Sequence, residues 1–241
     1  MIVEVCANSL ESALNAQKAG ADRIELCAEL GVGGVTPSYG LLKAIRKYIT
    51  IPVNVLIRPR SGDFTYTERE FEIMKHDIEM CKELGFNGIV SGVLLSDFSL
   101  DVERTKELVE LSKPLYFTFH RAIDWVKDPI ATLKQLERFG VDAILSSGQQ
   151  KSSVEGMNQL LELHNNTDRI VIMPGGGIRD TNVHQFKENG FGAVHLSGIR
   201  FHKTLEEVPE IPMSTPSFLR DNEVGVSNLE VLKNVMRVVK E

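Results

Sequence analysis

Short apolar runs alternate with longer segments of helical period along most of the chain. Eight of these runs have the length and the β-branched or aromatic content of strands. They are Ile2–Ala7, Arg23–Ala28, Val53–Arg58, Gly88–Val93, Leu115–His120, Ala143–Ser147, Ile170–Met173 and Ala193–Ser197. Each gap between them is long enough for one crossover helix. The pattern therefore predicts strands and helices in strict alternation.

Four of the predicted strands follow a similar phrase, in which a glycine ends a helix and a tight loop begins. These phrases precede strands two, four, six and eight, at residues 19–22, 84–87, 139–142 and 189–192. A strand-helix-strand-helix unit present four times predicts a (β/α)8 or TIM barrel, with one domain over residues 1–241. An open doubly wound sheet, the second possibility, does not explain the regularity through to the eighth strand.

Several helix ends carry recognisable signals. Thr67 with Glu70 is a predicted capping box, while Pro37 and Pro129 stand near the starts of two other helices. The pattern loosens after strand eight, because residues 199–226 are too long for a plain connection. The closing helix is expected at Ser227–Lys240. We interpret residues 199–226 as a long rim loop of the barrel, either a lid or a surface or oligomer contact.

The composition is that of a soluble globular protein, with 42% hydrophobic and 25% charged residues among 241. No apolar run approaches the roughly 18 residues of a membrane span, and no signal-peptide pattern precedes the first strand. Three cysteines fit a reducing compartment better than a disulfide framework. We therefore expect a cytoplasmic protein. The net charge of -6, without a basic block, argues against nucleic-acid binding.

Ionisable side chains gather on the strand faces that we assign to the barrel interior. The opposite faces are aliphatic and suit the covering helices. The expected inward residues are Ile2, Glu4, Cys6, Arg23, Glu25, Cys27, Asn54, Leu56, Arg58, Ser91, Thr118, His120, Ala193, His195 and Ser197. Strands six and seven are not resolved by this test.

Barrel cores are normally filled by branched aliphatic side chains, so this interior needs another explanation. Buried charges must be paired, and Glu4 and Glu25 are the nearest plausible partners of Arg58. One interpretation is a self-satisfied ion network that plugs the barrel. The other is a catalytic site formed by Glu4, Glu25, Arg58, His120 and His195.

Glycines follow the seventh and eighth predicted strands. The loops at these positions of a TIM barrel often bind phosphate, because glycine lets backbone N–H groups approach an anion. Tight turns that need a positive φ are the simpler alternative. Nearby arginines add positive charge and favour an anionic ligand. The predicted anion-binding residues are Arg60, Arg121, Gly175, Gly176, Gly177, Ser197 and Gly198.

Two cysteines share the phrase Glu-x-Cys-Ala, at residues 4–7 and 25–28. Adjacent strands lie about 4.8 Å apart, so thiolates of Cys6 and Cys27 at the rim are able to hold a soft ion such as Cu(I). The alternative is that each is a small buried hydrophobic residue. Cys81 lies on a predicted helix and is expected to be structural.

Several longer phrases of the chain resemble the CutC family of copper homeostasis proteins. These phrases occupy residues 4–7, 23–28, 33–38, 57–64, 118–121 and 175–177, within a match from residue 1 to about 200. The resemblance implies a cytoplasmic barrel, often a homo-oligomer, with a Cu(I) site at Cys6 and Cys27.

Two functions of different classes remain open from the sequence. A copper-binding protein would use Cys6 and Cys27 as ligands and need little of the arginine and glycine apparatus. A TIM-barrel enzyme would hold a small anionic or phosphorylated substrate through Arg58 and the glycines, while Glu4, Glu25, His120 or His195 moved protons. The expected partner is a metal ion or a small molecule in both cases, and neither function involves nucleic acid or membrane.

Overall fold

The computed structural model describes residues 1–213 and 221–241. Its main sheet has eight parallel strands in the order β7-β6-β5-β4-β3-β2-β1-β8, so chain neighbours are also sheet neighbours. The strands are β1 (Ile2–Ala7), β2 (Arg23–Leu26), β3 (Val53–Leu56), β4 (Gly88–Ser91), β5 (Tyr116–Phe119), β6 (Ala143–Ser146), β7 (Val171–Pro174) and β8 (Ala193–Leu196). A bridge between Gly175 and His195 joins the two ends of the sheet. The predicted TIM barrel is confirmed.

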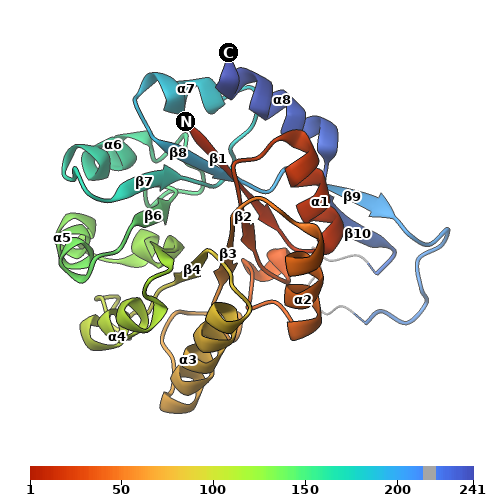
Figure 1. The fold of residues 1–241 in the computed structure, drawn as a ribbon. Helices are drawn as coiled ribbons and strands as arrows, with labels where there is room; N and C mark the ends of the chain where they lie inside the picture. Colours follow the sequence, from red (N-terminus) through yellow and green to blue (C-terminus); the bar gives the residue numbers. More distant parts are fainter. Residues whose placement is uncertain (214–220) are drawn as a thin grey trace.

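Helices surround the strands on the outside (Figure 1). They are α1 (Leu10–Ala19), α2 (Tyr39–Tyr48), α3 (Glu68–Glu83), α4 (Val102–Ser112), α5 (Pro129–Phe139), α6 (Met157–Asn165), α7 (Val183–Glu188) and α8 (Leu229–Lys240), with short 3-10 helices η1 (Leu30–Val32) and η2 (Arg121–Trp125). Helix α8 contacts both α7 and α1 and thereby completes the ring. No helix in the described part of the chain is long and apolar enough to cross a membrane.

The predicted helix-end signals act as expected. Thr67 and Glu70 form both hydrogen bonds of a capping box at the start of α3, and Pro129 is the first residue of α5. Ser38, which directly follows Pro37, caps α2. Gly20 and Gly140 end α1 and α5 with φ of 86° and 84°, a backbone conformation that favours glycine.

The two faces of the strands differ as predicted. Val5 and Ile24 belong to the apolar layer between strands and helices, whereas Glu4 and Glu25 on the alternate positions are buried inside. Strands six and seven, which parity left open, turn Leu145 and Met173 into a small inner cluster.

The inward orientation predicted for Ser91 is wrong. Val90 clusters inside the barrel with Leu56, while Ile89, on the face of Ser91, joins the outer core. The Ser91 hydroxyl donates to the Ile57 carbonyl oxygen at 2.9 Å. A backbone acceptor satisfies this polar group on the outer face, so its polarity did not indicate the interior.

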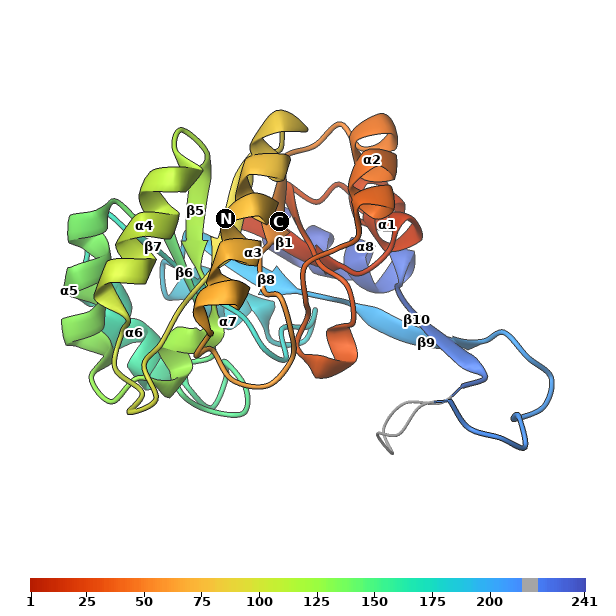
Figure 2. The same ribbon diagram turned by 90° about the horizontal axis from the view of Figure 1, so that it is seen from below.

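The two ends of the segment after β8 pair as a hairpin and are not irregular loop. Strands β9 (Ile199–Lys203) and β10 (Glu223–Ser227) pair antiparallel. Figure 2 shows this hairpin extending away from the barrel. Residues 214–220, inside the predicted rim segment 199–226, lie outside the described residues. The lid role of the segment stays a prediction.

Candidate functional site

A cavity of about 600 Å³ opens at the carboxyl ends of the strands. Several residues that lie just after the end of a strand line it. They include Arg58 after β3, His120 after β5, Gly176 and Gly177 after β7, and Ser197 and Gly198 after β8. Parallel strands all end at this edge, so residues far apart in sequence meet here.

The deepest polar group is a carboxylate held by two cationic side chains. Glu4 is fully buried, accepts from Arg23 Nε at 2.6 Å and faces His195 Nδ1 at 2.9 Å. Burial alone would raise the pKa of Glu4, but the hydrogen bond and charge of His195, with the charge of Arg23, outweigh it and lower this pKa. Burial alone would lower the pKa of His195, yet the negative charges of Glu25 and Glu4 raise it. Glu4 therefore orients His195 and stabilises its protonated ring.

Glu25 and Cys6 lie side by side above this group, on adjacent strands paired in register. The Cys6 thiol donates to Glu25 Oε1 at 3.5 Å, whereas Glu25 Oε2 is buried and has no hydrogen-bond partner among residues 1–213 and 221–241. Burial raises the pKa of Glu25 despite the nearby charge of His195. A hydrogen bond with Cys27 and burial raise the pKa of Cys6 well above its ordinary value. Both groups favour their protonated forms more than they would in water.

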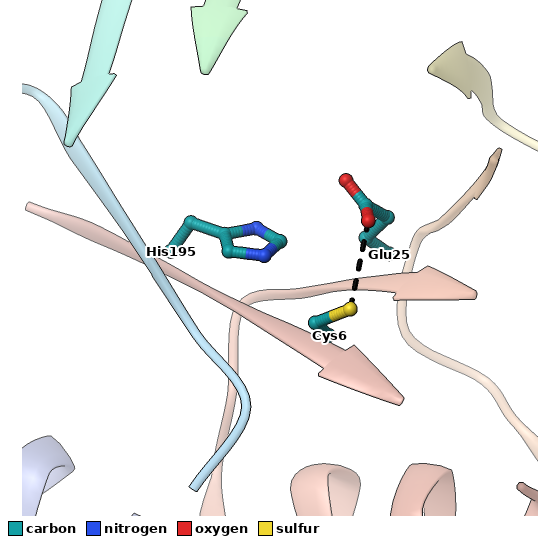
Figure 3. Close-up of side chains that lie close together, drawn as sticks. All are labelled: Cys6, Glu25 and His195. Carbon is teal, nitrogen blue, oxygen red and sulfur yellow. Dashed lines mark hydrogen bonds between the residues drawn. The ribbon is translucent and has the colours of Figure 1, made fainter. Parts of the chain in front are cut away.

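Three donor atoms are close enough together to ligate one ion. Cys6, Glu25 and His195 each offer one such atom, and these atoms lie within 4.8 Å of one another. Figure 3 shows the three side chains converging, with the imidazole ring directed toward Cys6 and Glu25. Cys27 Sγ lies 3.6 Å from Cys6 Sγ, which agrees with the predicted proximity of the cysteines. Cys27, however, is completely buried against Leu56 and Val90, so it lies behind Cys6 and not on the cavity wall.

The predicted pairing of Arg58 with Glu4 and Glu25 is wrong. Arg58 donates instead to the backbone carbonyl oxygens of Val32, Gly34 and Gly62, at 2.6–2.9 Å. It follows β3 by two residues and therefore lies nearer the rim than the acids. The carboxylate of Glu4 is already held by Arg23, an inward-facing residue that we had not assigned to the site.

His120 also lies at the rim, as the N-cap of η2. Its Nδ1 accepts from the Ala122 backbone N–H at 3.3 Å, and its ring packs 4.7 Å from that of Phe64. The close approach of Gly92 leaves no room for a Cβ atom, which would lie 2.7 Å from Nδ1. Burial and the positive charge of Arg58 lower the pKa of His120 to about 3. The ring is therefore neutral at physiological pH.

The predicted anion-binding residues divide into two groups. Arg121, Gly176, Gly177, Ser197 and Gly198 line the cavity, whereas Gly175 and Arg60 are not part of its wall. Arg60 donates to the carboxylates of Asp63 and Glu70 on the outer surface. Gly176 and Gly177 have φ of 100° and 80°, so the tight-turn interpretation also applies to them.

Further cavity residues were not foreseen from the sequence. Phe64, Arg179, Asp180 and Arg200 line the wall. Arg179 and Asp180 closely follow the glycine run, and this proximity in sequence could have indicated that they line the cavity. Arg200 belongs to β9, whose pairing with β10 is not visible in the hydrophobic pattern.

Comparison with known proteins identifies relatives over most of the chain. The CutC family matches residues 1–200. A Salmonella paratyphi A protein described as a family protein CutC is 45% identical over 196 residues, which cover 81% of this chain and 79% of that protein. A Salmonella typhi relative with the same description is also 45% identical and is covered to 76%.

Solved structures agree with this assignment. The crystal structure of CutC from Streptococcus agalactiae, whose name proposes a role in copper homeostasis, superposes with a TM-score of 0.78 at 34% identity. The match covers 82% of this chain and 98% of that one. A 3-hexulose-6-phosphate synthase from Salmonella typhimurium, at 17% identity and a TM-score of 0.58, shares the fold alone, with 100% and 99% of the two chains covered. Since both the family match and the identity extend over most of its length, the chain belongs to the CutC family.

Proposed function

We propose that the protein binds Cu(I) at the barrel mouth through Cys6 and Cys27; the name of its Streptococcus agalactiae relative refers to copper homeostasis. The observation that carries this proposal is the 3.6 Å separation of the two sulfur atoms, with donor atoms of Glu25 and His195 close to Cys6. Thiolates are the ligands that Cu(I) prefers, and imidazole also suits copper.

The residues present fit such an ion. Both thiols must lose a proton to ligate, and the raised pKa of Cys6 opposes this. A bound cation supplies the positive charge that makes the thiolates stable. Copper binding therefore releases protons, and its affinity increases with pH.

Titration with Cu(I) tests this function. The parent protein is expected to bind about one equivalent, and Cys6→Ser and Cys27→Ser to lose it because each removes one of two soft ligands. Cys81→Ser is the matched control, since Cys81 is equally buried but lies on α3. Unchanged stoichiometry in both site variants would refute the copper function.

A second function is favoured by the size of the cavity. A volume of about 600 Å³ is in the range of small-molecule sites and is much larger than a single ion needs. We infer a TIM-barrel enzyme that acts on a small anionic or phosphorylated substrate. The raised pKa values of Glu25 and His195 suit groups that exchange protons, with Glu4 orienting His195. Neutral and phosphorylated sugars, compared by their effect on melting temperature, test this function. If no phosphorylated sugar stabilises the protein more than its neutral counterpart, the enzyme function is not supported.

Organisation and location belong to the same proposal. We propose one domain, because a single apolar core joins residues from Val3 to Val239. We also propose a cytoplasmic homo-oligomer, supported by the family resemblance. A single cooperative unfolding transition and a mass above 26.9 kDa in light scattering are the expected results.

A further inference from the structure

We propose that the Nε–H of Arg58 and the Nε2–H of His120 form a subsite for an anionic oxygen group, a carboxylate or a phosphoryl group, of the small-molecule ligand. This inference rests on the second proposed function, that of a small-molecule enzyme. It assigns one end of the cavity to one chemical group of the substrate.

The first part of the subsite is a buried positive charge without a carboxylate partner. Arg58 is 5% exposed, and its three hydrogen-bond acceptors are neutral carbonyl oxygens, of Val32 in η1, of Gly34 just after η1, and of Gly62 in the loop after β3. The ion pairs found among residues 1–213 and 221–241 do not include it. Burial of an uncompensated guanidinium is costly, so the arrangement favours a bound anion. Among the described residues the Nε–H is buried without a hydrogen-bond partner, as is the Tyr66 hydroxyl, although the Arg58 side chain is close enough to that hydroxyl to lower its pKa against the effect of burial.

The second part is a neutral donor whose tautomer is set by the backbone. The Ala122 N–H points at His120 Nδ1, and an N–H donor requires a lone pair there. The ring hydrogen must then be on Nε2, an atom that is buried without a hydrogen-bond partner in the described part of the chain. A protonated ring would place two N–H groups against each other at Nδ1. The lowered pKa of His120 agrees with this argument.

The Phe64 ring packs against both donor side chains of the subsite, Arg58 and His120. Its ring centroid lies 5.2 Å from the Arg58 guanidinium carbon and 4.7 Å from the His120 ring centroid. Arg58, Phe64 and His120 all line the same cavity. A neutral imidazole beside a guanidinium adds a donor without adding charge repulsion, so both N–H groups can serve one oxyanion. The positive charge also makes this end unsuitable for a metal ion, which distinguishes it from the cluster of Cys6, Glu25 and His195.

The experiment is a titration of the full chain with inorganic phosphate and, separately, with acetate, followed by NMR of the 15N-labelled histidine rings. We expect His120 to show the Nε2–H tautomer before addition, and its Nε2 resonance to shift on saturation. The anion with the higher affinity identifies the group that the subsite takes. Arg58→Lys keeps the charge but loses the Nε–H, and should weaken binding by about 10-fold. His120→Phe should weaken binding similarly, and His120→Gln, which keeps an N–H donor, should restore part of it.

Arg60→Lys is the matched control, because Arg60 is close in sequence but lies outside the cavity wall. Its affinity for either anion should equal that of the parent. An Nδ1–H tautomer of His120 would overturn the subsite even if every variant failed to fold. Anion binding that survives both Arg58→Lys and His120→Phe would overturn the subsite and leave the enzyme function intact. If neither anion binds the parent, the subsite is rejected, while stabilisation by phosphorylated sugars still decides the enzyme function independently.

Discussion

Buried charges have different partners at two ends of the cavity: the inner end, here called the floor (Glu4, Arg23 and His195), and the outer end, the rim (Arg58 and His120). At the floor, side chains neutralise one another, with Glu4 between Arg23 and His195. At the rim, backbone carbonyls surround Arg58, and His120 stays neutral, so donors are left over. A self-paired group contributes to stability and needs no ligand, whereas a group with free donors is prepared for one. The ion-network interpretation thus fits the floor, and a ligand-binding interpretation fits the rim.

The largest expected effect comes from breaking the floor. Glu4→Ala leaves Arg23 and His195 buried without their shared carboxylate, and should lower the free energy of unfolding by about 3–5 kcal/mol. Urea denaturation measures the change. Lys113→Ala, which removes an exposed ion pair with Glu110, is the control and should change stability by less than about 1 kcal/mol. Equal effects of the two substitutions would show that the floor is not a stabilising network.

A smaller effect is expected from crowding the rim. A Cβ at position 92 would lie 2.7 Å from His120 Nδ1 and 3.1 Å from the Phe119 ring, so Gly92→Ala should cost about 1–3 kcal/mol. It should also weaken anion binding by displacing His120. Gly40→Ala is the control, because the nearest atom to its added Cβ is 4.0 Å away. A Gly92→Ala protein with parental stability and anion affinity would contradict the tight packing around His120.

Acid should reveal the neutral histidine of the rim. The pKa of His120 is about 3 in the folded protein against an ordinary value of 6.5, because burial and Arg58 disfavour the charged ring, opposed only in part by a backbone hydrogen bond and Asp124. The unfolded chain therefore binds a proton between these values that the folded protein does not. This contribution to stability is fully present above pH 6.5 and is lost as the pH falls toward 3.

The expected slope from this group is up to about 1.4 kcal/mol per pH unit. Denaturation of the parent and of His120→Gln at pH 7.5 and pH 5 isolates the contribution of His120 to this pH dependence. The variant should lose less stability on acidification. His184→Gln replaces an exposed histidine and is the control. Identical pH dependence in the parent and His120→Gln would exclude a buried neutral ring.

The smallest effect is expected just outside the rim. Arg60→Gln removes exposed ion pairs with Asp63 and Glu70, and should lower stability by less than about 1 kcal/mol. Copper and anion binding should be unchanged, as measured by the same titrations. A loss of anion affinity would place Arg60 in the site and remove the distinction between rim and surface.

The hydrophobic pattern by itself determined the barrel fold and which ionisable side chains of the first two strands face its interior. Alternation along β1 and β2 placed Glu4, Cys6 and Glu25 inside, because strand periodicity is a local property and the aliphatic faces must meet helices. Helix ends at Thr67 and Pro129 were equally local. Ser91 was predicted wrongly because a backbone acceptor just after the neighbouring strand β3 satisfies its hydroxyl, and a strand's own residues do not reveal that acceptor.

Only the tertiary structure decided which charges pair. The partners of Arg58 are carbonyls that η1 and the loop after β3 bring to it, and no side-chain pattern encodes the path of a loop. The neighbouring Arg60 turns outward to Asp63 and Glu70, although both arginines occupy one short phrase. The tautomer of His120 likewise depends on the direction of a single backbone N–H. Periodicity specifies the face of a strand from which a side chain projects, whereas hydrogen bonding depends on positions that form only when separate strands and loops come together.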